Sequence, residues 1–90
     1  MGGYEWDPGK AAANLAKHKV HFADAALSLE DPRVLTMPDP DAAAEERFIA
    51  LAADPTGRVL VTVFAYSGAN IRIISARRAI PGERKRYERS

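Results

Sequence analysis

The sequence predicts an α+β domain in which two N-terminal helices pack on a three- to four-stranded antiparallel sheet, followed by a short C-terminal helix. Two observations lead to this fold class. Apolar residues recur at helical spacing in the first third of the chain, whereas runs rich in valine and isoleucine follow later. The 90 residues are 47% hydrophobic, which suits one small domain with one core, residues 1–90.

Both N-terminal helices are predicted from start signals and spacing. Asp7 and Pro8 begin the first, because aspartate caps free amides and proline fits the first helical position. Residues at the spacing of one helix face continue it to Lys17 or His18. The second helix covers Phe22–Leu29, where apolar residues keep the same spacing, and a Glu-Asp-Pro segment then ends it.

Four runs are predicted to be strands, and a hairpin joins the last two. Glycine, proline and aspartate lie at the boundaries between the runs. A short helical turn is expected over Ala42–Glu45, and the charged segment PGERKRYERS after Ile80 is expected to form the C-terminal helix. The four predicted strands are residues 33–37, 47–54, 58–66 and 71–79.

Charge is separated along the chain, although the net charge is only +1. Residues 20–57 contain eight acidic and two basic side chains, a local charge of −6. Residues 70–90 contain seven basic and two acidic side chains, a local charge of +5. The basic segment is expected to bind an anion, and the acidic stretch Glu30–Glu46 to receive a basic partner segment. The alternative is that both segments are ordinary solvated faces.

Several classes of protein are excluded by what the chain lacks. Without cysteine it forms neither disulfides nor thiolate sites, and its two histidines lack the HExxH spacing of a zinc site. It contains no GxGxxG, GxxxxGK[ST] or GxSxG motif, so nucleotide-cofactor enzymes and serine hydrolases fit poorly. No apolar run reaches signal-peptide or transmembrane length. We therefore expect a cytoplasmic protein that uses no metal and no cofactor and does not enter a membrane.

The stretch IRIISARRA, residues 71–79, combines a strand pattern with three arginines. Strand alternation places Arg72 and Arg78 on one face and Arg77 on the other. A buried guanidinium is costly unless it is paired, so these side chains are expected to be paired or solvated. Together with Arg47 on a neighbouring strand, they suggest a phosphate clamp. The alternative is that each is an ordinary surface or paired arginine.

Proton transfer in such a site requires a histidine or a carboxylate. His18 ends the first predicted helix and is a candidate general acid or base, because histidine exchanges protons near neutral pH. Its alternative role is to interact with the last carbonyl groups of that helix. Glu45 and Glu46 are carboxylates that can pair with the arginines, and Glu46 is the second candidate for proton transfer.

Five segments resemble, in order, the motifs of BrnT-type toxins, the ribonuclease half of a bacterial toxin–antitoxin pair. They are EWDPGK, NLAKHKVHFADA, EERFIAL, IRIISARRA and ERKRYE, and together they extend over Tyr4–Glu88. The resemblance implies a RelE-like fold and metal-independent cleavage of RNA. It also implies a cognate antitoxin with a ribbon-helix-helix domain, which joins the toxin in a dimer or heterotetramer and brings the complex to operator DNA.

The resemblance also implies roles for particular residues, and it includes three departures. Many relatives have glycine at the position of Lys19, they often have glycine near Ala52, and they commonly have arginine at the position of Ser67. Asn14 is among the recurring polar positions, as is Asp7, which is explained as a helix cap. The residues with implied catalytic roles are Arg72, Arg47, Arg77, His18 and Glu46. The residues expected to bind RNA are Lys10, Lys17, Arg78, Arg84 and Lys85.

The residues can support this chemistry. RNA is cleaved when its own 2′-hydroxyl attacks the adjacent phosphate, so the protein must supply cations around the phosphorane and groups that move protons. Arg72 and Arg47 are preferred for this role, since Arg77 is expected on the opposite face unless a bulge or twist intervenes. Ser67 motivates a second hypothesis, a non-catalytic or degenerate toxin that acts as an antitoxin-binding co-repressor. A third, a general nucleic-acid binder, fits the basic C-terminal segment but not the acidic middle.

Overall fold

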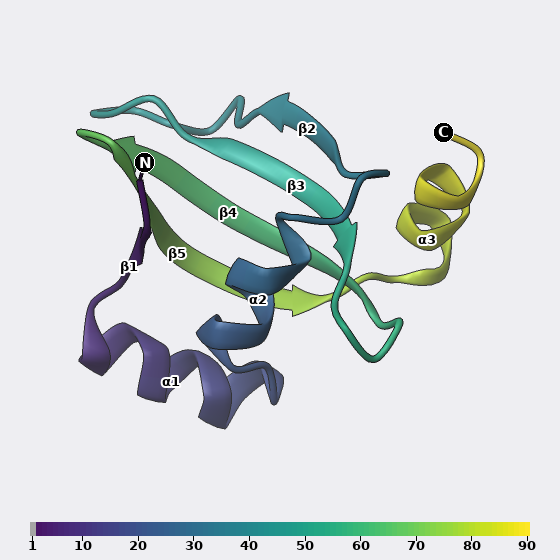
Figure 1. The fold of residues 1–90 in the computed structure, drawn as a ribbon, viewed down its shortest axis with the longest axis horizontal. Helices are drawn as coiled ribbons and strands as arrows, with labels where there is room; N and C mark the ends of the chain where they lie inside the picture. The colour runs from purple at the N-terminus through teal and green to yellow at the C-terminus, as the bar shows by residue number, and fades with distance from the viewer. Residues whose placement is uncertain (1) are drawn as a thin grey trace.

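The polypeptide forms a five-stranded sheet with helices on both of its faces (Figure 1). The structure is a computed structural model, and it describes residues 2–90. The strand order is β1-β5-β4-β3-β2. The elements, in chain order, are β1 (Tyr4–Glu5), α1 (Pro8–His18), α2 (Phe22–Ser28), β2 (Leu35–Pro38), β3 (Phe48–Ala53), β4 (Val59–Ser67), β5 (Asn70–Arg78) and α3 (Pro81–Glu88).

The sheet differs from the prediction in its number of strands and in one strand direction. Four strands were expected at most, all antiparallel, whereas β1 adds a fifth strand that pairs in parallel with β5. Tyr4 is the partner of Ile71, and Glu5 is the partner of Arg72. β1 has only two residues, too few to produce a period-two pattern in the sequence. β1 forms only because the N-terminal residues lie beside β5, a contact between segments far apart in the sequence.

The helices agree closely with their predicted bounds. The side chain of Asp7 accepts a hydrogen bond from the amide of Lys10 at 2.8 Å, which confirms its role as the N-cap of α1. Lys19 ends α1 with φ of 60°, the left-handed conformation that favours glycine at a helix C-terminus. The helical turn expected over Ala42–Glu45 is absent, because four residues do not repay helix nucleation and no apolar face is present to bury.

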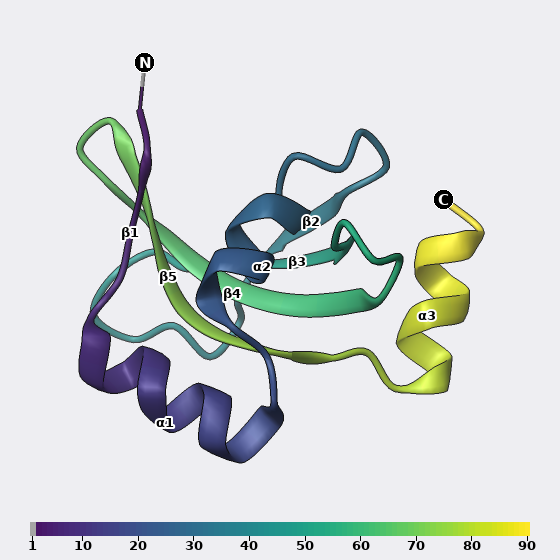
Figure 2. The same cartoon turned by 60° about the horizontal axis from the view of Figure 1, so that its bottom comes forward.

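Two clusters of apolar side chains hold the helices to the sheet. On one face, α1 and α2 cover Leu60, Phe64 and Ile73, all buried. On the other face, α3 contributes Tyr87, which packs against Leu51 and Val61. Figure 2 shows α1 and α2 together on one side and α3 beyond the end of β5. α3 leaves much of its own face of the sheet uncovered.

Polar contacts of Tyr87 and Asp31 fix α3 to the sheet. The hydroxyl of Tyr87 donates to the carboxylate of Asp31, which also accepts a hydrogen bond from the amide of Ala53 at 2.9 Å. The guanidinium of Arg33 lies 5.3 Å from the centre of the Tyr87 ring and donates to the carbonyl of Glu88. The position of α3 is thus set by a carboxylate, an aromatic ring and a cation.

Stability should fall in acid because of Asp31. Burial raises the pKa of Asp31, but hydrogen bonds from Tyr87 and from the amides of Ala53 and Arg33 outweigh it, so this pKa lies below its usual range. A lowered pKa gives stability that is present above the unfolded value of about 3.9 and is lost as pH falls through the folded value. Thermal unfolding between pH 6 and pH 2 should show a smaller fall for Asp31→Asn than for the wild type. The exposed Asp41→Asn serves as the control and should follow the wild type.

Candidate functional site

A β-bulge in β5 determines which arginines share a face of the sheet. Val63 pairs with Ser75 and Phe64 pairs with Ile73, so Ile74 is an extra residue between them. Arg72 is consequently the partner of Ala65, and Arg77 is the partner of Val61. These two β4 residues are four positions apart, so their side chains project from the same face.

The predicted grouping of the arginines is therefore wrong. Simple alternation paired Arg72 with Arg78 and placed Arg77 opposite, but the bulge brings Arg72 onto the face of Arg77. Arg78 is the partner of Leu60 and lies on the face that α1 and α2 cover. A one-residue insertion reverses the side-chain direction of all that follows it, and alternation in the sequence does not reveal it.

Arg47 lies beside Arg72 on the face of the sheet that α3 leaves largely uncovered, which we call the open face. Phe48 pairs with Phe64, so Arg47, one residue earlier, aligns with Ala65 from the other side of β4. Ala65 is buried, and Arg72 is its partner on β5. Arg47 and Arg72 thus flank one small residue from two strands, and we call this pair the arginine cluster.

Glu45 occupies the arginine cluster. One terminal nitrogen of Arg72 donates to both carboxylate oxygens of Glu45 at 2.6 Å, and Nε of Arg47 lies 3.8 Å from the same carboxylate. The hydrogen bond from Arg72 is the main reason that the pKa of Glu45 is lowered, and the charges of Arg72, Arg47 and Lys10 add to it. Two guanidinium groups against one carboxylate leave a net positive charge. Because ion pairs this exposed are weak, another anion can replace Glu45.

Arg77 does not belong to the arginine cluster, although it lies on the same face. Its guanidinium forms two hydrogen bonds to Glu83, at 2.9 and 2.8 Å, and Glu83 also accepts from the amide of Ile80. These contacts fix the start of α3. Since Val61 and Ala65 are four strand residues apart, Arg77 lies roughly 13 Å along the sheet from Arg72. It belongs to the α3 end of the open face, outside the arginine cluster.

His18 and Glu46, the two candidates for proton transfer, lie in different surroundings. His18 is the last residue of α1, which packs on the face opposite the arginine cluster. Its side chain forms no hydrogen bond within residues 2–90. Glu46 is exposed in the loop that carries Glu45, and it is Glu45 that contacts the arginines. The sequence did not indicate which of these two adjacent glutamates would pair with the arginines.

The residues expected to bind RNA are not gathered into one patch. Lys10 and Lys17 are exposed on α1, and Arg84 and Lys85 are exposed on α3. Lys10 is close enough to the arginine cluster to influence Glu45, after the larger effects of Arg72 and Arg47. Arg78 and Arg84 line one small pocket, which Lys17 and Lys85 do not reach, and the RNA-binding roles of these four residues stay predictions.

Ser67 lies on the face of the arginine cluster. It ends β4, pairs with Asn70, and is two residues from Ala65, so the two side chains point the same way. An arginine at this position would be a third cation beside Arg47 and Arg72. Serine leaves these two as the cations of the arginine cluster.

Neither a metal site nor a membrane span is found in the part of the chain that the structure describes. No group of three or more histidine, cysteine, aspartate or glutamate side chains among residues 2–90 is arranged to hold a metal ion. No helix within the same residues has both the length and the apolar character needed to cross a membrane.

Fold and site define a small α+β protein with an exposed arginine cluster on the open face of its sheet. Residues 6–83 match the sequence model of the family described as the ribonuclease toxin BrnT of type II toxin–antitoxin systems, and the chain belongs to this family. Its structure is similar to the crystal structure of the Brucella abortus ribonuclease toxin BrnT. The TM-score is 0.67 with 25% sequence identity, and the match covers 89% of this chain and 99% of that one. Comparison with curated proteins gives no match.

Proposed function

We propose that this protein is an endoribonuclease that cleaves RNA without a metal ion and is neutralised by a ribbon-helix-helix antitoxin. Membership of the BrnT family supports a ribonuclease and an antitoxin partner in general terms. The observation that carries the proposal is the arginine cluster, where two guanidinium groups from opposite sides of β4 meet at one exposed carboxylate. A carboxylate held in this way marks the place that a phosphate can take.

The mechanism assigns a task to each group at the cluster. The 2′-hydroxyl of the RNA attacks the adjacent phosphorus and a 2′,3′-cyclic phosphate forms. The bond to the 5′-oxygen breaks, and this oxygen takes a proton from water and leaves as a 5′-hydroxyl end. Arg72 and Arg47 stabilise the additional negative charge of the phosphorane, since preorganised cations act most strongly where charge develops. Glu46, with Glu45 once it is displaced, receives the proton of the 2′-hydroxyl in preference to His18, which lies on the other face.

A cleavage assay with a chelator tests the proposal directly. Purified protein is incubated with single-stranded RNA in the presence of excess EDTA, and the fragment ends are identified by mass spectrometry. We expect cleavage and 2′,3′-cyclic phosphate ends. Intact RNA, from protein whose fold is confirmed by circular dichroism, would contradict the claim of activity. Cleavage that stops on adding EDTA would contradict metal independence.

Removing the charge of Glu45 should strengthen RNA binding. Glu45→Gln leaves Arg72 and Arg47 without their carboxylate, so a phosphate no longer has to displace it. We expect the dissociation constant for RNA to fall about two- to fivefold, the range typical of an exposed ion pair, with a steeper dependence on salt. Glu46→Gln removes the same charge from the same loop and is the matched control. Equal effects of the two variants would show that only net charge matters.

Ser67 supports a second candidate function, that of a co-repressor. With serine where many relatives have arginine, the open face has one cation fewer, which favours a degenerate toxin that binds the antitoxin as a co-repressor. Expression of the protein alone separates the two functions. Growth arrest supports the ribonuclease, whereas antitoxin binding without growth arrest supports the co-repressor. Ser67→Arg should then restore arrest.

A further inference from the structure

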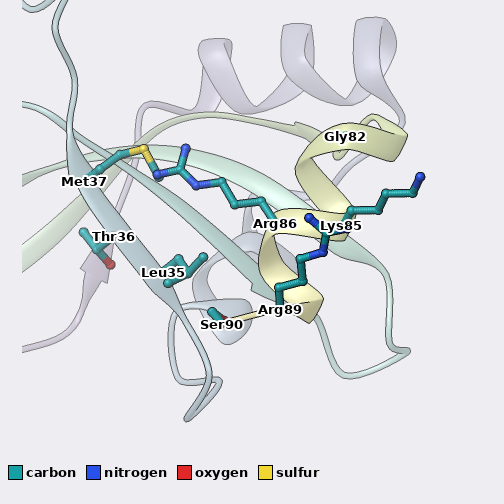
Figure 3. Close-up of a pocket in the computed structure, with 8 residues that line it drawn as sticks. All are labelled: Leu35, Thr36, Met37, Gly82, Lys85, Arg86, Arg89 and Ser90. Atoms are coloured by element: carbon teal, nitrogen blue, oxygen red, sulfur yellow. The ribbon is translucent and has the colours of Figure 1, made fainter.

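A groove separates β2 from α3 on the open side of the molecule (Figure 3). Its volume is about 540 Å³. One wall is the strand segment Leu35–Met37, and the other carries Lys85, Arg86 and Arg89 of the C-terminal segment. Figure 3 shows the side chain of Arg86 extending from α3 toward Met37, whereas Lys85 points away from the strand. The groove is separate from the arginine cluster and has no role in the mechanism above.

The strand wall of the groove is an unpaired edge of the sheet. β2 is the last strand in the order and pairs only with β3. Within residues 2–90, none of the turn, loop or cap hydrogen bonds uses the backbone of Leu35–Met37. The amide of Asp39 donates to the carbonyl of Arg47, so in this antiparallel register the backbone groups of Met37 and Leu35 also face β3. The N–H and C=O of Thr36 face the free side and are available to another strand. Pro38 ends the edge after a short length, which limits non-specific pairing with other sheets.

The helix wall of the groove is basic and unneutralised. Lys85, Arg86 and Arg89 are exposed, and none of them forms an ion pair within the described residues. The acidic stretch Glu30–Glu46 does not supply the missing charge, because several of its carboxylates already have partners. Asp31 holds α3 through Tyr87, and Glu45 holds Arg72.

We propose that this groove binds an extended, acid-rich segment of the antitoxin, which adds to β2 as a sixth strand. Main-chain hydrogen bonds form with the Leu35–Met37 edge, apolar side chains rest on Leu35 and Met37, and carboxylates pair with Arg86 and Arg89. The inference rests on the antitoxin partnership of the proposed function. It reverses the charge expected from the sequence, which paired Glu30–Glu46 with a basic segment of the partner.

A polypeptide fits this groove better than RNA does. Single-stranded RNA is held by aromatic side chains that stack on its bases, and no aromatic residue is among those lining the groove. A row of backbone groups on a sheet edge is matched in spacing by another strand and not by a sugar-phosphate chain. The basic side chains then select for acidic sequence.

Binding of the antitoxin encoded with this protein is the first test. Arg86→Gln/Arg89→Gln should weaken binding tenfold or more by titration calorimetry, with most of the difference lost at high salt. Lys10→Gln/Lys17→Gln, which removes two charges from α1, should change it less than twofold. In hydrogen exchange, the amide of Thr36 should gain protection in the complex.

A synthetic peptide provides a probe that does not depend on the antitoxin. A short peptide of alternating valine and glutamate should bind the wild type and lose affinity for Arg86→Gln/Arg89→Gln. A peptide of alternating valine and lysine should not bind. Equal affinity of the wild type and Arg86→Gln/Arg89→Gln for the antitoxin would overturn the inference. Complex formation without protection of the Thr36 amide would also overturn it.

RNA in the groove is the other outcome that would overturn it. In that case Arg86→Gln/Arg89→Gln would lose RNA cleavage and keep antitoxin binding. Failure of the proposed function has a different signature. If the wild type leaves RNA intact, the ribonuclease activity is contradicted. If Arg86→Gln/Arg89→Gln nevertheless loses antitoxin binding, the groove is still supported as the antitoxin site.

Discussion

Arg72→Ala should lower the rate of RNA cleavage on the order of tenfold or more at saturating RNA. Arg72 presents its guanidinium at the open face, where it already binds both oxygens of one carboxylate. A non-bridging pair of phosphate oxygens offers the same geometry. The interaction strengthens as charge builds on the phosphorane, so its loss should reduce kcat more than it raises KM. Single-turnover cleavage of a labelled RNA measures both.

Two further variants decide how Arg72 acts. Arg72→Lys keeps the charge but loses the planar fork, so a rate close to that of Arg72→Ala identifies two-point binding, and a rate near the wild type identifies charge alone. Arg89→Ala removes an exposed arginine far from the arginine cluster and should cleave at the wild-type rate. If Arg72→Ala also cleaves at that rate while folded, the arginine cluster is not the catalytic site.

The place of Arg72 could be predicted only in part from sequence. A strand over residues 71–79 with its arginines was predicted from β-branched residues and a hairpin loop, and β5 covers Asn70–Arg78. The bulge at Ile74 was not, since an extra residue in one strand leaves no mark on a pattern read from that strand alone. The consequence was specific: the sequence separated Arg72 from Arg77, whereas the folded sheet gives them one face.

The rest of the site shows the same limit. Arg47 and Arg72 were predicted together and do meet, because Arg72 lies in β5 and Arg47 directly precedes β3, and both strands have a clear pattern. Glu45 could not be chosen over Glu46, since a loop that does not repeat has no periodicity to orient its side chains. His18 was placed at the end of its helix correctly, but which face that helix covers depends on packing between elements distant in sequence.

Asn14 illustrates a polar residue whose task is structural. It lies buried on α1, and its side-chain nitrogen donates to the carbonyls of Ala76 at 2.8 Å and Val20 at 3.1 Å. Its oxygen accepts from the amide of Ala76 at 3.1 Å. β1 pairs with β5 only at Ile71 and Arg72, so the edge of β5 beyond them needs another partner. The Asn14 amide supplies a donor and an acceptor there, as a neighbouring strand would.

Asn14→Ala should therefore lower the free energy of unfolding by about 3 kcal/mol, because it leaves buried donors and acceptors of Ala76 and Val20 unpaired. For a domain of this length, that corresponds to a fall in Tm of about 12–24 °C. Alanine forms helices better than asparagine does, so helix propensity alone predicts that Asn14→Ala raises the free energy of unfolding. The sign of the measured change therefore distinguishes the two explanations. Thermal unfolding followed by circular dichroism measures it.

Lys17→Ala is the control for Asn14→Ala, since it truncates an exposed side chain of the same helix and should change stability by less than about 0.5 kcal/mol. Asn14→Ala protein assayed at low temperature, where it is still folded, should cleave RNA at the wild-type rate. If Asn14→Ala is as stable as the wild type but inactive, Asn14 has a role in catalysis or RNA binding and not in the stability of the fold. The expected result assigns Asn14 a structural role, because one edge of β5 needs its amide.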